Sequence, residues 1–162
     1  MINLFEILIF AGLANMAPPL VVPLFPKMNT PLDCGHSFKG TRIFGDHKTW
    51  RGLIFGTLIS GLAWIIYSSL TKTDPNLFLG FQLGFGALMG DAIKSFFKRR
   101  VGVKSGQSWF PFDQIDWVIG ASLMVINQIN FLKFLLLLIL GLGLHLIVKL
   151  LGYLLKINPT II

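Results

Sequence analysis

Charge is scarce in this sequence. Only 13% of its 162 residues are Asp, Glu, Lys or Arg, whereas 54% are hydrophobic, and a typical soluble domain carries about 25% charged residues. The mean hydropathy is +0.72. Such a chain cannot cover its apolar surface in water, so lipid must act as much of its solvent. We therefore expect an all-α integral membrane protein that forms a single transmembrane domain over residues 1–162.

Cysteine and acidic residues are scarce as well. Cys34 is the only cysteine, so an internal disulfide is excluded. The three histidines form no zinc pattern, and no Gly-x-Ser-x-Gly or other nucleophile signature is present. The 7 acids stand against 14 Lys and Arg residues, which gives a net charge of +7. Because the basic residues cluster between apolar runs, as in cytoplasmic loops of membrane proteins, nucleic acid is not an expected partner.

Five apolar stretches follow one another along the chain. Most are near the ~20 residues that an α-helix needs to span lipid, although the fourth is marginal. A bundle of five transmembrane helices is therefore expected, and the absence of Lys and Arg before the first stretch favours a permanent helix over a signal peptide. The stretches run roughly over Ile7–Phe25, Gly52–Leu70, Leu77–Phe97, Ile115–Leu132 and Phe134–Leu155.

Basic residues are concentrated in two of the segments between these stretches. One follows the first stretch and the other follows the third, whereas the remaining two segments hold little beyond Lys72 and Lys133. The positive-inside rule places the two basic segments in the cytoplasm, the N-terminus outside and the C-terminus inside. We expect a multi-pass protein of the cell membrane, with polar cytoplasmic loops that form its site.

Ionisable residues inside an apolar stretch are expensive and indicate function. Asp91, Lys94, Ser95 and Lys98 are spaced at i, i+3, i+4 and i+7, so they share one face of a helix. A structural ion pair with snorkelling lysines would explain the basic residues at this helix end, but it explains the buried acid Asp91 poorly.

Two further acids follow the same basic segment. Asp113 and Asp116 lie three residues apart at the start of the fourth stretch, where acids can also simply complement a helix dipole. Together with Asp91 they make three of the seven acids in the chain. Carboxylates beside clustered cations suit Mg²⁺ and a polyphosphate, because Mg²⁺ takes oxygen ligands from one or two carboxylates and from phosphates.

The segment from Pro31 to Gly52 interleaves glycines with Arg, Lys and Thr. Such a segment can direct backbone N–H groups and cations toward phosphate. It is not a P-loop, because the upstream glycine and the preceding strand are missing. In the first stretch, Asn15 precedes Pro18 and further prolines, and prolines at membrane depth fit a bent helix that lines a cavity.

These motifs resemble a known family of lipid enzymes. Ser95-x-Phe97-Lys98-Arg99 followed by Asp113-Gln114-Ile115-Asp116 resembles the C-terminal signature of CDP-diacylglycerol synthases, with Gln114 in place of an Arg. The chain more closely resembles the small archaeal branch, the CDP-archaeol synthases. The shared runs are Pro-x-Asp-x-Gly at Pro31–Gly35, Arg-x-Phe-Gly-Asp-x-Lys-Thr-x-Arg-Gly at Arg42–Gly52, Gly-Asp-x-x-Lys-Ser at Gly90–Ser95 and the Asp-Gln-x-Asp ending.

The resemblance implies an enzyme that transfers a cytidylyl group from CTP to an ether-lipid phosphate, with Mg²⁺ as cofactor and CDP-archaeol and pyrophosphate as products. CTP, the lipid phosphate and membrane lipids are then the partners, and a spare glycine face permits a homodimer. We expect the catalytic residues to be Asp91, Lys94, Lys98, Asp113 and Asp116, with the three acids as metal ligands. The expected nucleotide-binding residues are Arg42, Asp46, Lys48, Thr49, Arg51, Ser95, Arg99 and Lys104, and the expected lipid-binding residues are Asn15 and Pro18.

Two alternatives remain open at the level of sequence. A CDP-alcohol phosphotransferase would carry the motif Asp-Gly-x2-Ala-Arg. This chain has Asp33-Cys34-Gly35 and no Ala-Arg pair after it. A small transporter or channel could use an intramembrane Asp91 and Lys94. That class predicts polar groups spread across the bilayer, whereas here they gather toward one face. The ether lipid rests on the resemblance alone, and no residue is identified that reads the cytosine.

Overall fold

The computed structural model describes residues 2–72, 76–103 and 107–154. Within them the chain forms five α-helices, so the predicted helix number is confirmed, and it adds a small hairpin and a short 3₁₀ helix that were not predicted. The elements are α1 (Leu4–Val21), β1 (Ser37–Phe38), β2 (Thr41–Arg42), α2 (Trp50–Thr71), α3 (Leu79–Arg100), α4 (Phe112–Met124), η1 (Ile126–Gln128) and α5 (Phe131–Leu154).

Side chains next to the helix ends explain where α1 and α2 begin. The Asn3 side chain accepts hydrogen bonds from the backbone N–H groups of the first turn of α1, and Glu6 accepts one from the Asn3 N–H, which completes a capping box. Thr49 caps α2 by accepting a hydrogen bond from the Gly52 N–H. At its other end α1 stops at Val21, earlier than predicted, because the prolines that follow cannot donate backbone hydrogen bonds.

The fourth predicted stretch, Ile115–Leu132, is not one continuous helix. α4 has only 13 residues, or about 20 Å at 1.5 Å per residue, against a hydrocarbon core of about 30 Å. The chain leaves the helix at Val125, turns through η1 and begins α5 at Phe131. Polar residues cause the break, and the Asn130 side chain accepts a hydrogen bond from the Lys133 N–H in the first turn of α5.

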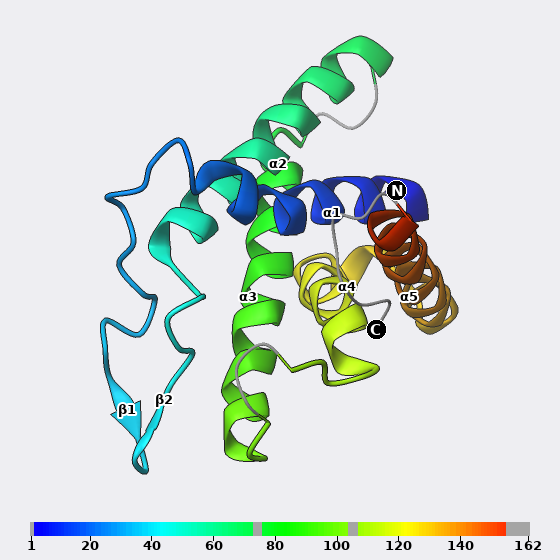
Figure 1. Cartoon of the computed structure of the whole chain (residues 1–162). Helices are drawn as coiled ribbons and strands as arrows, with labels where there is room; N and C mark the ends of the chain where they lie inside the picture. Colours follow the sequence, from blue (N-terminus) through cyan, green and yellow to red (C-terminus); the bar gives the residue numbers. More distant parts are fainter. Residues whose placement is uncertain (1, 73–75, 104–106, 155–162) are drawn as a thin grey trace.

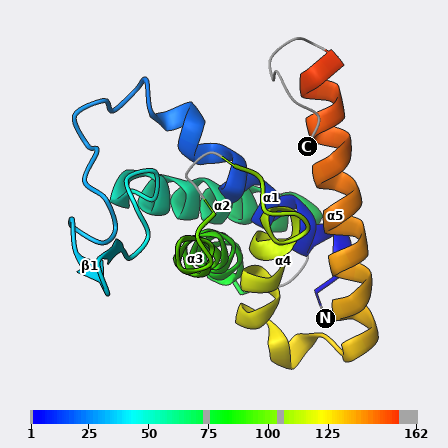
Figure 2. The same cartoon turned by 60° about the horizontal axis from the view of Figure 1, so that its bottom comes forward.

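Helix α3 lies at the centre of the molecule. It contacts α1, α2 and α4, and α4 in turn contacts α5. In Figure 1 α1 runs across α3, and in Figure 2, where α3 is seen end-on, α4 lies between α3 and α5. The crossing of α1 over α3 is steep (Figure 1). The β1–β2 hairpin lies beside the C-terminal end of α3 (Figure 1).

The apolar surface is divided between a small core and an outer face. Leu83 of α3, Trp64 of α2 and Val118 of α4 are fully buried, whereas many Leu, Ile and Phe side chains point outward. Three helices among the described residues, α1, α2 and α5, are long and apolar enough to cross a membrane. Outward apolar side chains on such helices are what lipid requires. These features indicate a multi-pass membrane protein, and the five-span topology stays a prediction.

Candidate active site

Glycines bring α3 and α4 into close contact at the level of the predicted acids. A Cβ atom on Gly90 would overlap the carbonyl oxygen of Asp116, and one on Gly120 would overlap that of Gly86. Small residues of this kind allow helix backbones to approach each other in lipid. The approach places the Asp116 side chain directly against the charged face of α3.

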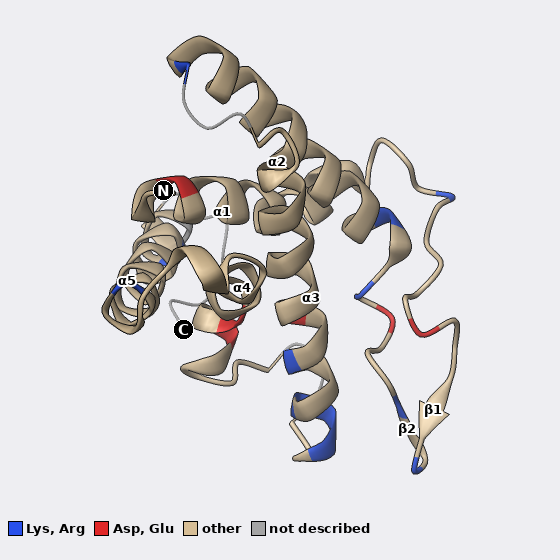
Figure 3. Ribbon diagram, turned by 180° about the vertical axis from the view of Figure 1, so that it is seen from behind, with Lys and Arg blue, Asp and Glu red and all other residues tan. Residues whose placement is uncertain are grey.

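Three carboxylates from two helices converge on the ammonium group of Lys94. Its Nζ lies 3.2 Å from Asp91 Oδ1, 2.6 Å from Asp113 Oδ1 and 3.0 Å from Asp116 Oδ2. The Lys94 side chain is 14% exposed and that of Asp116 5%, so the ion pairs are shielded from bulk solvent. Figure 3 shows the acidic segments of α3 and α4 on facing sides of the two helices. We call Asp91, Lys94, Asp113 and Asp116 the carboxylate cluster.

Two more lysines extend the carboxylate cluster in opposite directions. Lys98, one turn beyond Lys94, donates to Asp113 Oδ2 at 2.8 Å. Lys48, from the segment before α2, forms an ion pair with Asp91. Asp113 also accepts a hydrogen bond from the Trp109 N–H at 2.6 Å. Acid groups and cations far apart in the sequence are thus brought together, as the spacing predicted. Among the described residues, no three His, Cys, Asp or Glu side chains form a group that could hold a metal ion as they stand.

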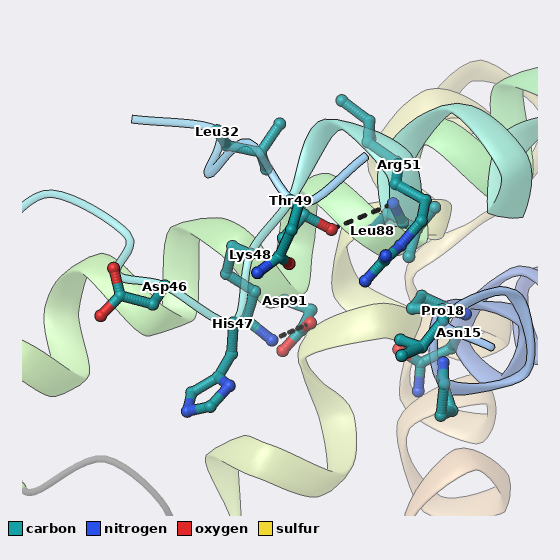
Figure 4. A pocket seen from close by; sticks show the side chains of 15 residues that line it. Asn15, Pro18, Leu32, Asp46, His47, Lys48, Thr49, Arg51, Leu88 and Asp91 are labelled. Carbon is teal, nitrogen blue, oxygen red and sulfur yellow. Dashed lines mark hydrogen bonds and ion pairs between the residues drawn. The ribbon is translucent and has the colours of Figure 1, made fainter. Parts of the chain in front are cut away.

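A cavity of about 570 Å³ with both polar and apolar lining residues adjoins the Asp91 side of the carboxylate cluster. We call it the polar cavity, after the polar residues that distinguish it. Its walls come from α1, α2, α3 and the segment before α2, and Figure 4 shows Lys48 reaching Asp91 with Asn15 and Pro18 on the side away from Asp46. Its polar lining residues are Asn15, Asn29, Asp46, His47, Lys48, Thr49, Arg51 and Asp91. His47 was missed at the level of sequence because nothing in its spacing distinguishes it from an ordinary loop histidine.

Arg51 is the most deeply buried cation of this cavity. The residue is 5% exposed, and its Nη1 donates to the Phe25 carbonyl oxygen at 2.7 Å. Its Nε is buried without a hydrogen-bond partner in the described part of the chain. A buried guanidinium with a donor left over is suited to bind an oxyanion.

Asp33 organises the loop that carries Lys48. Its buried carboxylate accepts hydrogen bonds from the backbone N–H groups of Gly35, Phe44 and Gly45 and from the Arg42 guanidinium, whose Nη2 lies 2.5 Å from Oδ1. Burial by itself would raise the pKa of Asp33, but the hydrogen bond from Arg42 and those from the backbone outweigh burial and lower the pKa below its usual value. The charged Asp33 carboxylate therefore holds the loop in its shape. The sequence offered one sign of this, the Pro-x-Asp-x-Gly run.

The same loop is fastened to the C-terminal end of α3. Arg99 Nε donates to the Phe44 carbonyl oxygen at 2.8 Å, and the Arg100 guanidinium lies 5.3 Å from the Phe38 ring centroid, within cation–π range. Gly45 has φ +88°, and a Cβ there would overlap the Arg99 side chain. These contacts fix the loop opposite the carboxylate cluster.

The remaining predicted site residues lie outside the carboxylate cluster. Arg42 pairs with Asp46 at 2.7 Å as well as with Asp33, Ser95 donates to the Asp91 carbonyl oxygen at 2.8 Å, and Arg99 holds the loop. Lys104 lies outside the described residues. The nucleotide-binding, lipid-binding and metal-binding roles therefore stay predictions.

Three helices long and apolar enough to cross a membrane, together with a carboxylate–lysine site on the two helices α3 and α4, define a multi-pass membrane protein with a charged site. A family model described as CarS-like CDP-archaeol synthase matches residues 4–161. The chain belongs to the CDP-archaeol synthase family. The predicted family is confirmed.

Individual relatives agree with the family match. A CDP-archaeol synthase of Saccharolobus islandicus is 37% identical over 161 residues, which cover 96% of this chain and 93% of that protein. Those of Methanoculleus marisnigri and Thermococcus onnurineus are 43% and 42% identical, over 60% and 68% of this chain. These two matches span 63% and 66% of the relatives' own lengths, slightly less than two thirds.

A solved structure shares the fold. It is described as an intramembrane enzyme for archaeal membrane lipid biosynthesis, with a TM-score of 0.78 and 26% sequence identity. The match covers 90% of this chain and 91% of that one.

Proposed function

We propose that this protein transfers the cytidylyl group of CTP to the phosphate of an ether lipid, with release of pyrophosphate. The observation that carries the proposal is the carboxylate cluster, which lies beside a polar cavity bordered by Lys48 and Arg51. Family membership supports the same reaction. The cavity volume of about 570 Å³ lies within the usual range for small-molecule sites, about 300–1,000 Å³.

The reaction needs charge neutralisation more than it needs a protein base. An oxygen of the lipid phosphate attacks the α-phosphorus of CTP, a new P–O bond forms there, and the bond from the α-phosphorus to the bridging oxygen of pyrophosphate breaks. A phosphate monoester is largely dianionic at pH 7, because its second pKa is about 6. The difficulty is to bring two anions together in line, which requires positioning and electrostatic stabilisation.

The cations around the cavity fit this requirement. Arg51 has a buried donor left over for an oxyanion, and Lys48 stands at the border between the cavity and the carboxylate cluster. We assign both to the triphosphate. Lys94 and Lys98, which hold the acids in the structure, would neutralise the phosphates around the reacting centre.

The carboxylate cluster has the donor chemistry that Mg²⁺ prefers. We propose that Asp91, Asp113 and Asp116 hold Mg²⁺, since hard oxygen donors beside a phosphate site are its usual ligands. When bound, the ion would neutralise phosphate charge and favour the departure of pyrophosphate. In the structure Lys94 bridges all three acids, and together with Lys48 and Lys98 it would balance their charge when no ion is present.

The transporter alternative is not favoured by the family match. In Figure 3 the acidic and basic segments of α3 and α4 lie together toward the C-terminal end of α3, whereas α1 and the far end of α2 carry only isolated charged segments. A transport path needs polar groups at several depths in the bilayer. The positive-inside rule supports a site that faces the cytoplasm, and the homodimer stays a prediction.

The assay uses labelled CTP and a lipid phosphate in detergent. We expect the wild-type protein to release pyrophosphate in a Mg²⁺-dependent way, and Asp116→Asn to lose at least about 100-fold in turnover, because it removes one charged partner from the reacting centre. Lys133→Met, a charge-removing variant at the start of α5, is the control and should retain turnover. Near-wild-type turnover in Asp116→Asn would remove this acid from the metal site. A wild-type protein without pyrophosphate release would refute the proposed function.

A further inference from the structure

A second hollow lies between α3 and α4, on the other side of the carboxylate cluster. It measures about 370 Å³ and is almost entirely apolar. Ile93 and Phe97 of α3 and Leu123 and Met124 of α4 form much of its wall. The two charged residues that line it are Lys94 and Asp116. We call this hollow the α3–α4 groove.

The groove and the polar cavity approach the same ion pairs from opposite faces of α3. With 3.6 residues per turn, Leu88 and Asp91 lie on one side of the helix, whereas Ile93 and Phe97 lie on the other. Leu88 and Asp91 line the polar cavity, and Ile93 and Phe97 line the groove. Lys94 joins the two sides, because its Nζ contacts Asp91 at 3.2 Å and Asp116 at 3.0 Å.

An apolar groove that ends beside the ion pair of Lys94 and Asp116 is not an ordinary lipid-facing surface. Helix faces that only contact lipid tails have no reason to enclose a lysine and an aspartate, since each buried charge is costly. A molecule with one anionic end and a long hydrocarbon part matches both features. From the level of Lys94 to that of Gly86 the groove follows α3 for about 12 Å, at 1.5 Å per residue.

We infer that the α3–α4 groove holds a hydrocarbon chain of the lipid phosphate, with its phosphate at Lys94. The inference rests on the proposed function and deepens it, because it gives the two substrates separate sites on opposite faces of α3. The nucleotide occupies the polar cavity, and the lipid enters sideways from the bilayer. Two substrates on opposite sides of the reacting centre suit an in-line attack. Asn15 and Pro18 line the polar cavity, so their predicted lipid-binding role is a separate hypothesis with which this inference competes.

Filling the groove tests the inference. Leu123 is 55% exposed and lines the groove, so Leu123→Trp can fill this space without disturbing the core. We expect the KM for a long-chain lipid phosphate to rise at least about tenfold, the effect of displacing about two methylene groups, with an unchanged KM for CTP. Leu62→Trp, on α2 and 56% exposed, is the matched control and should leave both KM values unchanged.

A competing route along α1 gives the opposite pattern. Val22 lines the polar cavity, so a rise in lipid KM for Val22→Trp together with an unchanged lipid KM for Leu123→Trp would overturn the inference. A lipid phosphate with a photoreactive group at its chain end provides a measurement that needs no turnover. Crosslinks to Met89 or Leu123 support the groove, and crosslinks to α1 refute it. If the wild-type protein releases no pyrophosphate, the crosslinks still report on the groove, so the two failures are distinguishable.

Discussion

Lys94 holds an unusual position for a single side chain. One ammonium group satisfies three carboxylates from two helices, and without it Asp91, Asp113 and Asp116 would repel each other in a poorly solvated place. Breaking a buried ion pair by removal of one partner costs about 3–5 kcal/mol. Lys94 therefore stabilises the three acids in the substrate-free protein and would neutralise phosphate in the proposed reaction. Both roles depend on its Nζ atom.

Asp33 gives a prediction about pH. Because folding lowers its pKa, the stabilisation that it provides is fully present above the ordinary value of 3.8 and is lost as the pH falls through the lower value of the folded loop. The N–H groups of Phe44 and Gly45 donate to Asp33. We expect the protection of these two amides against exchange, relative to an unfolded chain at the same pH, to persist down to about pH 4. Hydrogen exchange followed by mass spectrometry measures this.

The Asp33→Asn variant sharpens that measurement. It should speed exchange at Phe44 and Gly45 at least about tenfold at pH 7, because charged hydrogen bonds contribute about 1.5–3 kcal/mol. Asp46→Asn is the control: the Asp46 side chain is 76% exposed and has one ion-pair partner, so its removal should have a much smaller effect. Equal effects of the two variants would contradict the role assigned to Asp33.

At the scale of elements, the contact between α3 and α4 positions the site. Gly120→Ala should lower the temperature of half-inactivation and reduce turnover, because its Cβ would overlap the Gly86 carbonyl oxygen and overpacking typically costs about 1–3 kcal/mol. Gly143→Ala in α5 is the matched control, since nothing lies within 4 Å of its Cβ position. Thermal inactivation in detergent distinguishes them. If Gly120→Ala behaves like Gly143→Ala, close packing of these helices is not what positions Asp116.

The same elements show how far the sequence could be interpreted. Helical spacing predicted that Asp91, Lys94 and Lys98 share one face, and the structure brings that face to Asp113, because these are local relations along a helix. The end of α4 and the steep crossing of α1 over α3 could not be predicted. Both depend on tertiary packing, such as the fit of Gly90 against Asp116, for which hydropathy carries no signal.

The roles of the basic residues could also not be predicted from their spacing in the sequence. Arg42 and Arg99 resemble phosphate ligands in sequence, but in the structure they bind Asp33 and the Phe44 carbonyl oxygen. A motif identifies a cation without showing which acceptor it meets. Arg51, by contrast, lines the cavity, and its buried Nε has no hydrogen-bond partner among the described residues.

At the scale of the whole molecule, the orientation in the membrane can be tested with a native residue. Cys34 is the only cysteine and is exposed in the loop beside the site. If this loop is cytoplasmic, as the positive-inside rule predicts, a membrane-impermeant maleimide should label Cys34 in inside-out vesicles and leave it unlabelled in intact cells.

The matched control moves the thiol to the far end of α2. Leu70 is 79% exposed there, so a Cys34→Ser, Leu70→Cys double variant should be labelled from outside the cell only. Labelling of both proteins from one side would place both ends of α2 on the same face and contradict a spanning α2. The reversed labelling pattern would show that the protein has the opposite orientation in the membrane, with the site facing the outside of the cell.

The short α4 has a consequence for the surrounding lipid. A helix of 13 residues is about two thirds as long as the hydrophobic core of a bilayer is thick. With α4 oriented across the membrane, the bilayer beside it would have to become thinner, at a cost of fractions of a kcal/mol per Å of mismatch. The α3–α4 groove opens along this same helix. The thickness of the host membrane would then affect how easily a lipid head group reaches Lys94, without any change in the protein itself.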